Sequence, residues 1–102
     1  MANFLDLVQS ETPVLVDFHA TWCQPCHMLA PVLQNLARVN GDRLKIIKID
    51  IDQHQALAQH LNITGVPTLM LYQNGELKWR QSGVVPQHVL QEKIQPYFQS
   101  EP

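Results

Sequence analysis

Two cysteines three residues apart carry the clearest chemical signal in this sequence. They stand in Trp22-Cys23-Gln24-Pro25-Cys26, between an apolar run and an amphipathic segment. If a helix begins here, unpaired N–H groups and the positive end of the helix dipole favour a thiolate at Cys23. Pro25 fits the first helical turn, and Cys26 lies one turn in, close enough to attack the Cys23 sulfur. The pattern predicts thiol–disulfide exchange, with Cys23 as nucleophile and Cys26 as resolving residue.

The same pair allows three other interpretations. Two cysteines can simply pack in a core, although a pair at a strand-to-helix junction is more specific than a bare C-x-x-C. With His27 the motif also fits C-x-x-C-H, the attachment pattern of c-type haem, which requires export and usually a largely helical fold. Two thiolates with His27 or His19 could ligate a metal or, after dimerisation, an iron–sulfur cluster. Metal or cluster binding is kept as the binding-class alternative.

An acidic residue interrupts the apolar run that precedes the cysteines. Asp17 is flanked by Val14, Leu15, Val16 and Phe18, so its carboxyl should be buried in a strand, where desolvation disfavours the charged form. Buried ionisable groups near a nucleophile often carry protons. Asp17 is therefore a candidate functional residue.

The hydrophobic pattern predicts the elements that position these residues. Residues 14–18 form an apolar run without alternation, which is typical of a strand buried on both faces. Residues 26–39 repeat apolar side chains at helical spacing and end at Asn40-Gly41, and residues 44–49 form a second, β-branched strand. Strand, helix and strand in this order predict a βαβ unit with parallel strands and a right-handed crossover.

A hairpin is predicted in the second half of the chain. Asn74-Gly75 separates apolar runs at residues 68–72 and 76–80, and a type I′ turn needs positive φ at both central residues. Further helices are predicted over residues 3–10, 53–61 and 86–97, the last bent or ended at Pro96. The whole chain, residues 1–102, is thus expected to form one α/β domain with a mixed four-stranded sheet.

Composition narrows the function classes. The net charge is 7 − 9 = −2 with neutral histidines, and the basic residues are scattered, so nucleic acid and anionic lipid are not expected partners. No apolar run reaches the roughly 20 residues that span a bilayer. The first residues lack the pattern of a secretory signal, and two cysteines cannot form a secreted-type disulfide framework. We expect a cytoplasmic protein.

Several motifs occur along the chain in the same order as in one known protein family. Residues 16–26, with Met28, Ala30-Pro31 and Leu33 after them, are similar to the active-site segment of the thioredoxin family. The similarity continues through residues 48–52, 65–69, 74–75 and 82–83. The chain therefore resembles the thioredoxin family over nearly its whole length. The resemblance implies the thioredoxin fold, a central mixed sheet flanked by helices.

The resemblance also implies a substrate surface. Pro67 corresponds to the proline that faces the cysteine pair in the family and presents a substrate backbone, so we predict that the Val66–Pro67 bond is cis. Trp22, Val66, Gly83 and Val84 correspond to the apolar rim on which the family docks disulfide-containing segments.

The implied activity is the reduction of protein disulfides. Asp17 corresponds to the proton acceptor that helps Cys26 become a thiolate, and Lys48 to its electrostatic partner. The family carries no prosthetic group, and its electrons come from NADPH through a separate thioredoxin reductase, within electron transport and cell redox homeostasis. The enzymatic alternative is a thiol oxidase or isomerase, which would have a higher potential and usually be exported.

Several positions depart from the family pattern. His19 replaces the usual Trp on the strand face of Asp17, near the matched position of Asp52; it is either a packing substitution or a titrating group that alters proton traffic. Gln24 replaces the Gly between the cysteines, where side chains tune the reduction potential. His27 replaces the usual Lys and, if cationic, would stabilise a thiolate.

The start of the chain is a further departure. The chain begins at the predicted first helix, so the N-terminal edge strand of the family should be missing and the sheet should have four strands. The strand at residues 44–50 would then be an exposed edge, guarded by Lys45 and Lys48 or paired with another chain. We expect a monomer, with dimerisation through this edge as the alternative.

Overall fold

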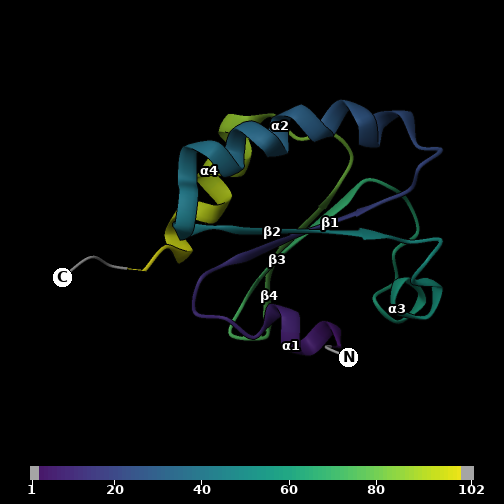
Figure 1. Cartoon of the computed structure of the whole chain (residues 1–102), viewed down its shortest axis with the longest axis horizontal. Coiled ribbons are helices and arrows are strands. Elements are labelled where there is room, and N and C mark those ends of the chain that lie inside the picture. The colour runs from purple at the N-terminus through teal and green to yellow at the C-terminus, as the bar shows by residue number, and fades with distance from the viewer. Residues whose placement is uncertain (1–2, 100–102) are drawn as a thin grey trace.

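The structure, a computed structural model, describes residues 3–99. Four strands form one sheet with helices on both faces (Figure 1). The elements are α1 (Phe4–Val8), β1 (Val14–His19), α2 (Gln24–Asn40), β2 (Lys45–Asp50), α3 (Gln55–His60), β3 (Thr68–Gln73), β4 (Glu76–Ser82) and α4 (Gln87–Ile94), with 3₁₀ turns at Gly41–Arg43 and Gln95–Tyr97. Within residues 3–99, no helix is both long and apolar enough to cross a membrane.

The sheet is mixed, as the sequence predicts. Its strand order is β2-β1-β3-β4. β1 runs parallel to β2 and antiparallel to β3, and β3 runs antiparallel to β4. β1 is therefore an interior strand, and residues 14–18 are all buried. β2 is an edge strand with exposed Lys45 and Lys48.

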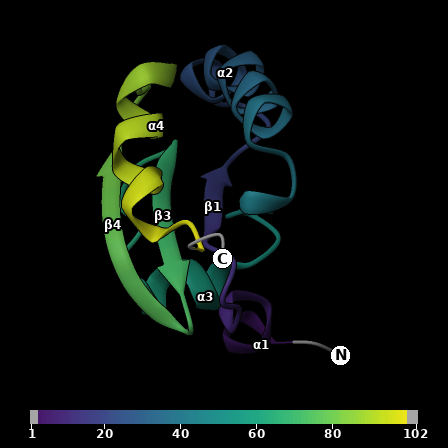
Figure 2. The same cartoon turned by 90° about the vertical axis from the view of Figure 1, so that its left-hand side faces the viewer.

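Two helices cover each face of the sheet. α2 and α4 pack on one face, and α1 and α3 lie on the other (Figures 1 and 2). The core under α2 and α4 contains buried Leu, Val and Ile side chains: Leu15, Leu29, Leu33, Leu36, Leu44, Leu69, Leu71, Val85, Leu90 and Ile94. The core on the opposite face contains Val8, Val14, Val16, Phe18, Ile49, Met70 and Tyr72. Successive side chains of β1 belong to these two cores in turn, because residues along a strand point alternately to its two faces.

The limits of α2 follow from local chemistry. Cys23 is the N-cap, and Pro25 lies in the first turn, where its missing N–H leaves no bond unmade. The helix therefore begins two residues before the predicted start at Cys26. It ends at Asn40, because Gly41 adopts φ 54°, a conformation that favours glycine. The long helix thus points its N-terminus, with the cysteine pair, beyond the end of β1.

The hairpin and the closing helix also follow the sequence pattern. Asn74 and Gly75 have φ values of 53° and 80°, as a type I′ turn requires. α4 starts after Pro86 and ends at Ile94, and the following 3₁₀ turn contains Pro96. The predicted end of the helix at this proline is confirmed.

Candidate active site

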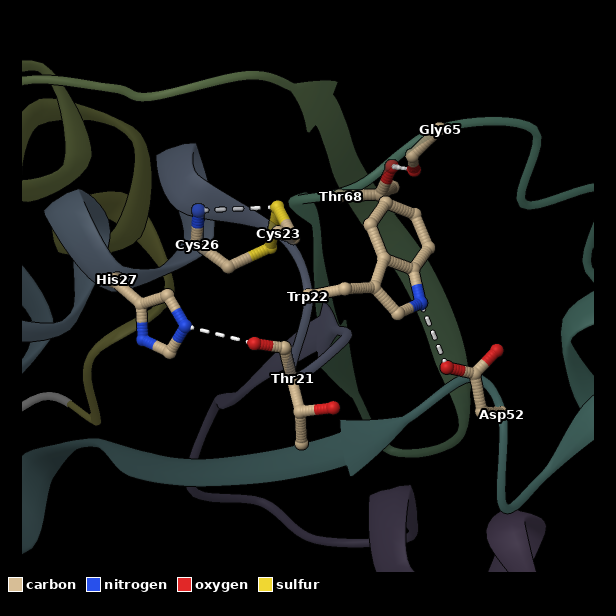
Figure 3. The surroundings of a disulfide bond; sticks show 8 residues. All are labelled: Thr21, Trp22, Cys23, Cys26, His27, Asp52, Gly65 and Thr68. Carbon is tan, nitrogen blue, oxygen red and sulfur yellow. Dashed lines mark hydrogen bonds between the residues drawn. A yellow bond between two sulfur atoms is a disulfide. The ribbon is translucent and has the colours of Figure 1, made fainter.

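The cysteine pair lies where β1 gives way to α2. Cys23 and Cys26 form a disulfide with a Cα–Cα distance of 5.3 Å. The backbone N–H of Cys26 donates a hydrogen bond of 3.1 Å to Cys23 Sγ (Figure 3). The same N–H would face a thiolate at Cys23 after reduction, together with the positive end of α2. Cys23 thus lies at the N-terminus of α2, where the sequence analysis expects it.

The surroundings of the two sulfur-bearing residues differ more than their exposure does. Cys23 is 3% and Cys26 is 8% exposed, so accessibility does not single out the nucleophile. Cys26 lines a cavity of about 180 Å³ that reaches Asp17, and Cys23 is not among its lining residues. Cys26 therefore shares this cavity with a buried carboxyl group, and Cys23 does not line it.

Asp17 is buried without a hydrogen-bond partner on one of its oxygens. The residue is 3% exposed, and its Oδ1 finds no partner within the described part of the chain. Burial raises the pKa of Asp17, while positive charge on His19 and Lys48 opposes that rise. Lys48 is the register partner of Asp17 across the parallel pair β1–β2. The structure thus brings the predicted proton acceptor and its predicted partner together.

Two histidines line the same cavity. His19 and His27 contribute to it from β1 and from α2. The Nε2 atom of His27 donates a hydrogen bond of 2.9 Å to the carbonyl oxygen of Thr21 (Figure 3). This bond ties the first turn of α2 to the segment before Cys23, and it requires the proton on Nε2 of His27.

Trp22 and Asp52 form a second contact beside the disulfide. The indole N–H of Trp22 donates a hydrogen bond of 2.8 Å to Oδ2 of Asp52 (Figure 3). Trp22 is nevertheless 67% exposed. The sequence analysis expects Asp52 near His19. In the structure the Asp52 carboxylate binds the Trp22 indole, and the residue paired with His19 across the strands is Asp50.

The loop before β3 contacts the cysteines from the other side. The Val66–Pro67 bond is cis, as predicted. Val66 packs against the small cluster of Ala20, Cys23 and Cys26. The Gly83 N–H donates a hydrogen bond of 2.8 Å to the Pro67 carbonyl oxygen. The structure thus links Gly83 to the loop that touches the disulfide.

The remaining candidate site residues differ in how far their side chains are exposed to solvent. Val84 is 43% exposed and Val66 is half-buried, so both offer apolar surface, whereas Pro67 is buried. Gln24 and Pro25 are exposed at the start of α2. Their side chains are free to meet another molecule rather than the core.

Sequence reasoning missed two residues that shape this region. The hydroxyl of Thr68 donates a 2.6 Å hydrogen bond to the carbonyl oxygen of Gly65 (Figure 3) and lies 3.0 Å from the Ser82 hydroxyl. Asp50 Oδ1 accepts a 2.8 Å hydrogen bond from the Asp52 N–H. A signal existed for both, because Thr68 follows Pro67 directly and Asp50 stands two positions after Lys48 on a predicted strand.

Comparison with known proteins decides the family. The family model described as Thioredoxin matches residues 1–96. The chain belongs to the thioredoxin family. Thioredoxin 1 of Chlorobaculum tepidum is 40% identical over 96 residues, which cover 92% of this chain and 95% of that protein. Thioredoxin of Bacillus subtilis is 43% identical over 89 residues, 87% of this chain and 86% of that protein.

Solved thioredoxin structures share the fold. A mutant thioredoxin from Halobacterium salinarum matches with a TM-score of 0.82 and 40% identity, over 96% of this chain and 86% of that one. Oxidised mitochondrial thioredoxin 3 from Saccharomyces cerevisiae matches with a TM-score of 0.82 and 31% identity, over 91% and 86% of the two chains. The predicted thioredoxin fold is confirmed.

Family membership establishes the activity. This member of the family is a thiol–disulfide oxidoreductase that reduces protein disulfides, and its redox group is the Cys23–Cys26 pair. Thioredoxins act on disulfide-containing proteins, are served by reductases and carry no prosthetic cofactor. Within residues 3–99, no group of three or more His, Cys, Asp or Glu side chains is arranged to hold a metal ion. The relatives give no support to a thiol oxidase or a metal carrier.

Proposed function

We propose that Cys23 attacks the substrate disulfide, that Cys26 resolves the mixed disulfide, and that Asp17 accepts the Cys26 proton. The observation that carries this proposal is the asymmetry of the pair. Cys23 Sγ receives the N–H at the start of α2, whereas Cys26 opens onto the cavity that holds Asp17. This asymmetry supports a stabilised thiolate at Cys23 and a proton acceptor for Cys26 at Asp17.

The reaction consists of two exchanges. The Cys23 thiolate attacks one sulfur of the substrate disulfide; a Cys23–substrate disulfide forms and the other substrate sulfur leaves as a thiolate. Cys26 then gives its proton to Asp17 and attacks the Cys23 sulfur. The substrate's second thiolate leaves, and the Cys23–Cys26 disulfide forms. Two electrons pass from the thioredoxin to the substrate, whose thiolates take up protons from solution.

Asp17 suits this role because its charge is costly. A buried carboxylate without a complete set of hydrogen bonds takes up a proton more readily than an exposed one. Lys48, in register with Asp17 on β2, offsets part of that cost. Burial therefore raises the pKa of Asp17, and a carboxyl group whose pKa is raised is a better proton acceptor for Cys26.

Five residues are proposed to hold the substrate next to Cys23. Val66 touches the cysteine cluster, Val84 and Trp22 are exposed, and Gly83 is bonded to Pro67. Trp22 and Val84 supply apolar surface, and the Val66–Pro67 segment presents backbone groups to an extended substrate.

Five residues are proposed to modulate the exchange: His19, Gln24, Pro25, His27 and Asp52. Asp52 orients the Trp22 indole, and His27 ties the first turn of α2 to Thr21. Gln24 and Pro25 lie between the cysteines and change the relative stability of dithiol and disulfide.

The cellular setting completes the proposal. One domain spanning residues 1–102 works as a monomer in the cytoplasm, as part of electron transport and cell redox homeostasis. A separate thioredoxin reductase returns the disulfide to the dithiol with electrons from NADPH. A lone C-x-x-C pair suits such a reducing compartment.

Trapping of the mixed disulfide tests the assignment of the cysteines. Cys26→Ser and Cys23→Ser form a matched pair of variants, each with one thiol. Incubated with a disulfide-containing protein, reduced Cys26→Ser should accumulate a stable 1:1 adduct through Cys23, detected by non-reducing mass spectrometry. Cys23→Ser should form little adduct. Equal trapping by the two variants would remove the assignment. Adduct formation only through Cys26 would reverse it.

A further inference from the structure

Four ionisable side chains adjoin one another at the carboxyl ends of β1 and β2. The parallel register pairs Asp17 with Lys48 and His19 with Asp50. Residues two apart on a strand share a face, and Leu15 in the same series packs in the core under α2. We call these four residues the charged square. Each acidic member has one basic neighbour along its own strand and another across the strands.

Exposure changes across the charged square. Asp17 is buried, His19 and Asp50 are half-buried, and Lys48 is exposed. His19 also lines the cavity that holds Asp17 and Cys26. His19 is therefore reached by solvent protons and lies close to the buried carboxyl group.

The groups facing His19 come from all the elements around the cavity. Asp17 lies on the same strand, Lys48 and Asp50 lie on β2, and His27 lies on α2 with its Nε2 proton given to the Thr21 carbonyl. The Asp52 carboxylate is occupied by the Trp22 indole, and His54 Nδ1 donates to the Asp50 carbonyl oxygen. Asp17 and Asp50 are thus the two carboxyl groups placed beside the imidazole.

The geometry points to a regulatory role for His19: in its cationic form it keeps Asp17 ionised, and so it extends disulfide reduction into mildly acidic solution. The inference rests on the proposed role of Asp17 as proton acceptor for Cys26. His19 acts through Asp17 and does not touch the reacting sulfur atoms, so it is a positioning residue.

The pH range follows from the chemistry of the two basic neighbours. An opposite charge within about 4–6 Å lowers the pKa of a carboxyl group by roughly 1–3 units. Lysine in general stays charged through the neutral range, whereas histidine is the side chain that changes charge between about pH 5 and 8. A histidine cation that forms beside Asp17 in acidic solution opposes the uptake of a proton by the carboxyl group. The Asp17 base therefore remains available at a lower pH.

The test compares two substitutions of His19. His19→Gln removes the titrating charge, and His19→Lys keeps a cation. Each reduced protein is mixed with an excess of a disulfide peptide, quenched in acid, and the decay of the Cys23 mixed disulfide is followed by mass spectrometry from about pH 5.5 to 9. His19→Gln should shift the acid limb of the profile up by about one pH unit, roughly a tenfold slower decay at pH 6. At pH 9, where an ordinary thiol loses its proton without help from a base, the decay rate of His19→Gln should be within about twofold of the parent rate.

Controls separate this inference from a general loss of structure. His19→Lys should restore the parent rate at pH 6, and His88→Gln, an exposed histidine on α4, should leave the profile unchanged. In an Asp17→Asn background, His19→Gln should have no further effect on the acid limb. An unshifted limb in His19→Gln, or no rescue in a folded His19→Lys, overturns the inference. If Asp17→Asn itself leaves the decay unchanged, the proposed role of Asp17 fails first.

Discussion

The two faces of the sheet are built differently. The face toward α1 and α3 is apolar along all of β1, where Val14, Val16 and Phe18 are fully buried. The face toward α2 starts in the same way with Leu15 but continues with Asp17 and His19. The polar residues begin where the strand reaches the cysteine pair.

This difference separates stability from chemistry within one strand. A buried apolar side chain stabilises the fold by leaving water, whereas a buried carboxyl group without full hydrogen bonding destabilises it. Asp17 therefore lowers the free energy of unfolding, and under the proposed mechanism it supplies the proton acceptor for Cys26. Substitution of Asp17 and substitution of the apolar residues on the opposite face should therefore have opposite effects on stability, and only the substitution of Asp17 should change the exchange reaction directly.

The largest effect on stability is expected on the apolar face. Phe18→Ala removes a fully buried aromatic ring that contacts Phe4, and it should lower the free energy of unfolding by about 3–5 kcal/mol. Urea denaturation of the oxidised protein measures the loss. The fraction that remains folded should reduce disulfides at the parent rate. A slower rate in the folded fraction would contradict the claim that this face affects stability and not the exchange reaction.

Asp17→Asn should act in the opposite direction on stability and slow the resolving step. The rate of mixed-disulfide decay at pH 7 should fall about 100-fold, because general-base help to Cys26 is lost. The variant should be more stable than the parent by about 1–3 kcal/mol at pH 8. Stopped-flow quenching and urea denaturation measure the two quantities.

The pH dependence of that gain in stability has a definite sign. Because burial raises the pKa of Asp17, the folded protein holds this proton to a higher pH than the unfolded chain does. The parent therefore loses stability as the pH rises through the folded-state pKa, and Asn does not. The advantage of Asp17→Asn should disappear below about pH 4, where the aspartic acid is protonated in both states. If the stability advantage of Asp17→Asn grew as the pH fell, the claim that burial raises the pKa of Asp17 would be contradicted.

Trp22→Phe should have a smaller effect, confined to substrate binding. The substitution keeps an aromatic ring but removes the hydrogen bond to Asp52, which is worth about 0.5–1.5 kcal/mol. We expect a rise in KM for a protein disulfide of roughly 2–10-fold with little change in kcat. Asp52→Asn is the matched variant from the other side of the bond, and the double variant should be no worse than either single one.

The smallest effect is expected from Lys48→Gln. Lys48 is exposed, so solvent screens its charge and its hold on Asp17 is weak. The acid limb of the pH–rate profile should move up by less than about one unit, and the rate at pH 9 should not change. An effect as large as that of Asp17→Asn would mean that Lys48 has a role of its own.

Much of this arrangement could be predicted from the sequence because it depends on local patterns. The apolar run of β1, the helical spacing after Cys26 and the Asn74-Gly75 turn each determine an element by themselves. The cis bond at Pro67 needed the family resemblance, since X–Pro bonds are mostly trans.

The remaining features depend on register and on backbone groups. Asp50 lies beside His19 because of the exact register between β1 and β2, which the sequence does not reveal. The bond from His27 to the Thr21 carbonyl, and the bond from Thr68 to the Gly65 carbonyl, use acceptors that every residue carries. Residue types alone cannot reveal such partners.

A redox titration of the Cys23–Cys26 pair tests the central claim most directly. The protein is equilibrated with dithiothreitol or glutathione buffers, and the oxidised fraction is read by thiol alkylation and mass spectrometry, with Cys23→Ser as the blank. A reductase should show a two-electron transition near the value typical of thioredoxins, about −270 mV. A potential near that of DsbA-type oxidants, about −120 mV, would contradict the assignment of this chain as a disulfide reductase.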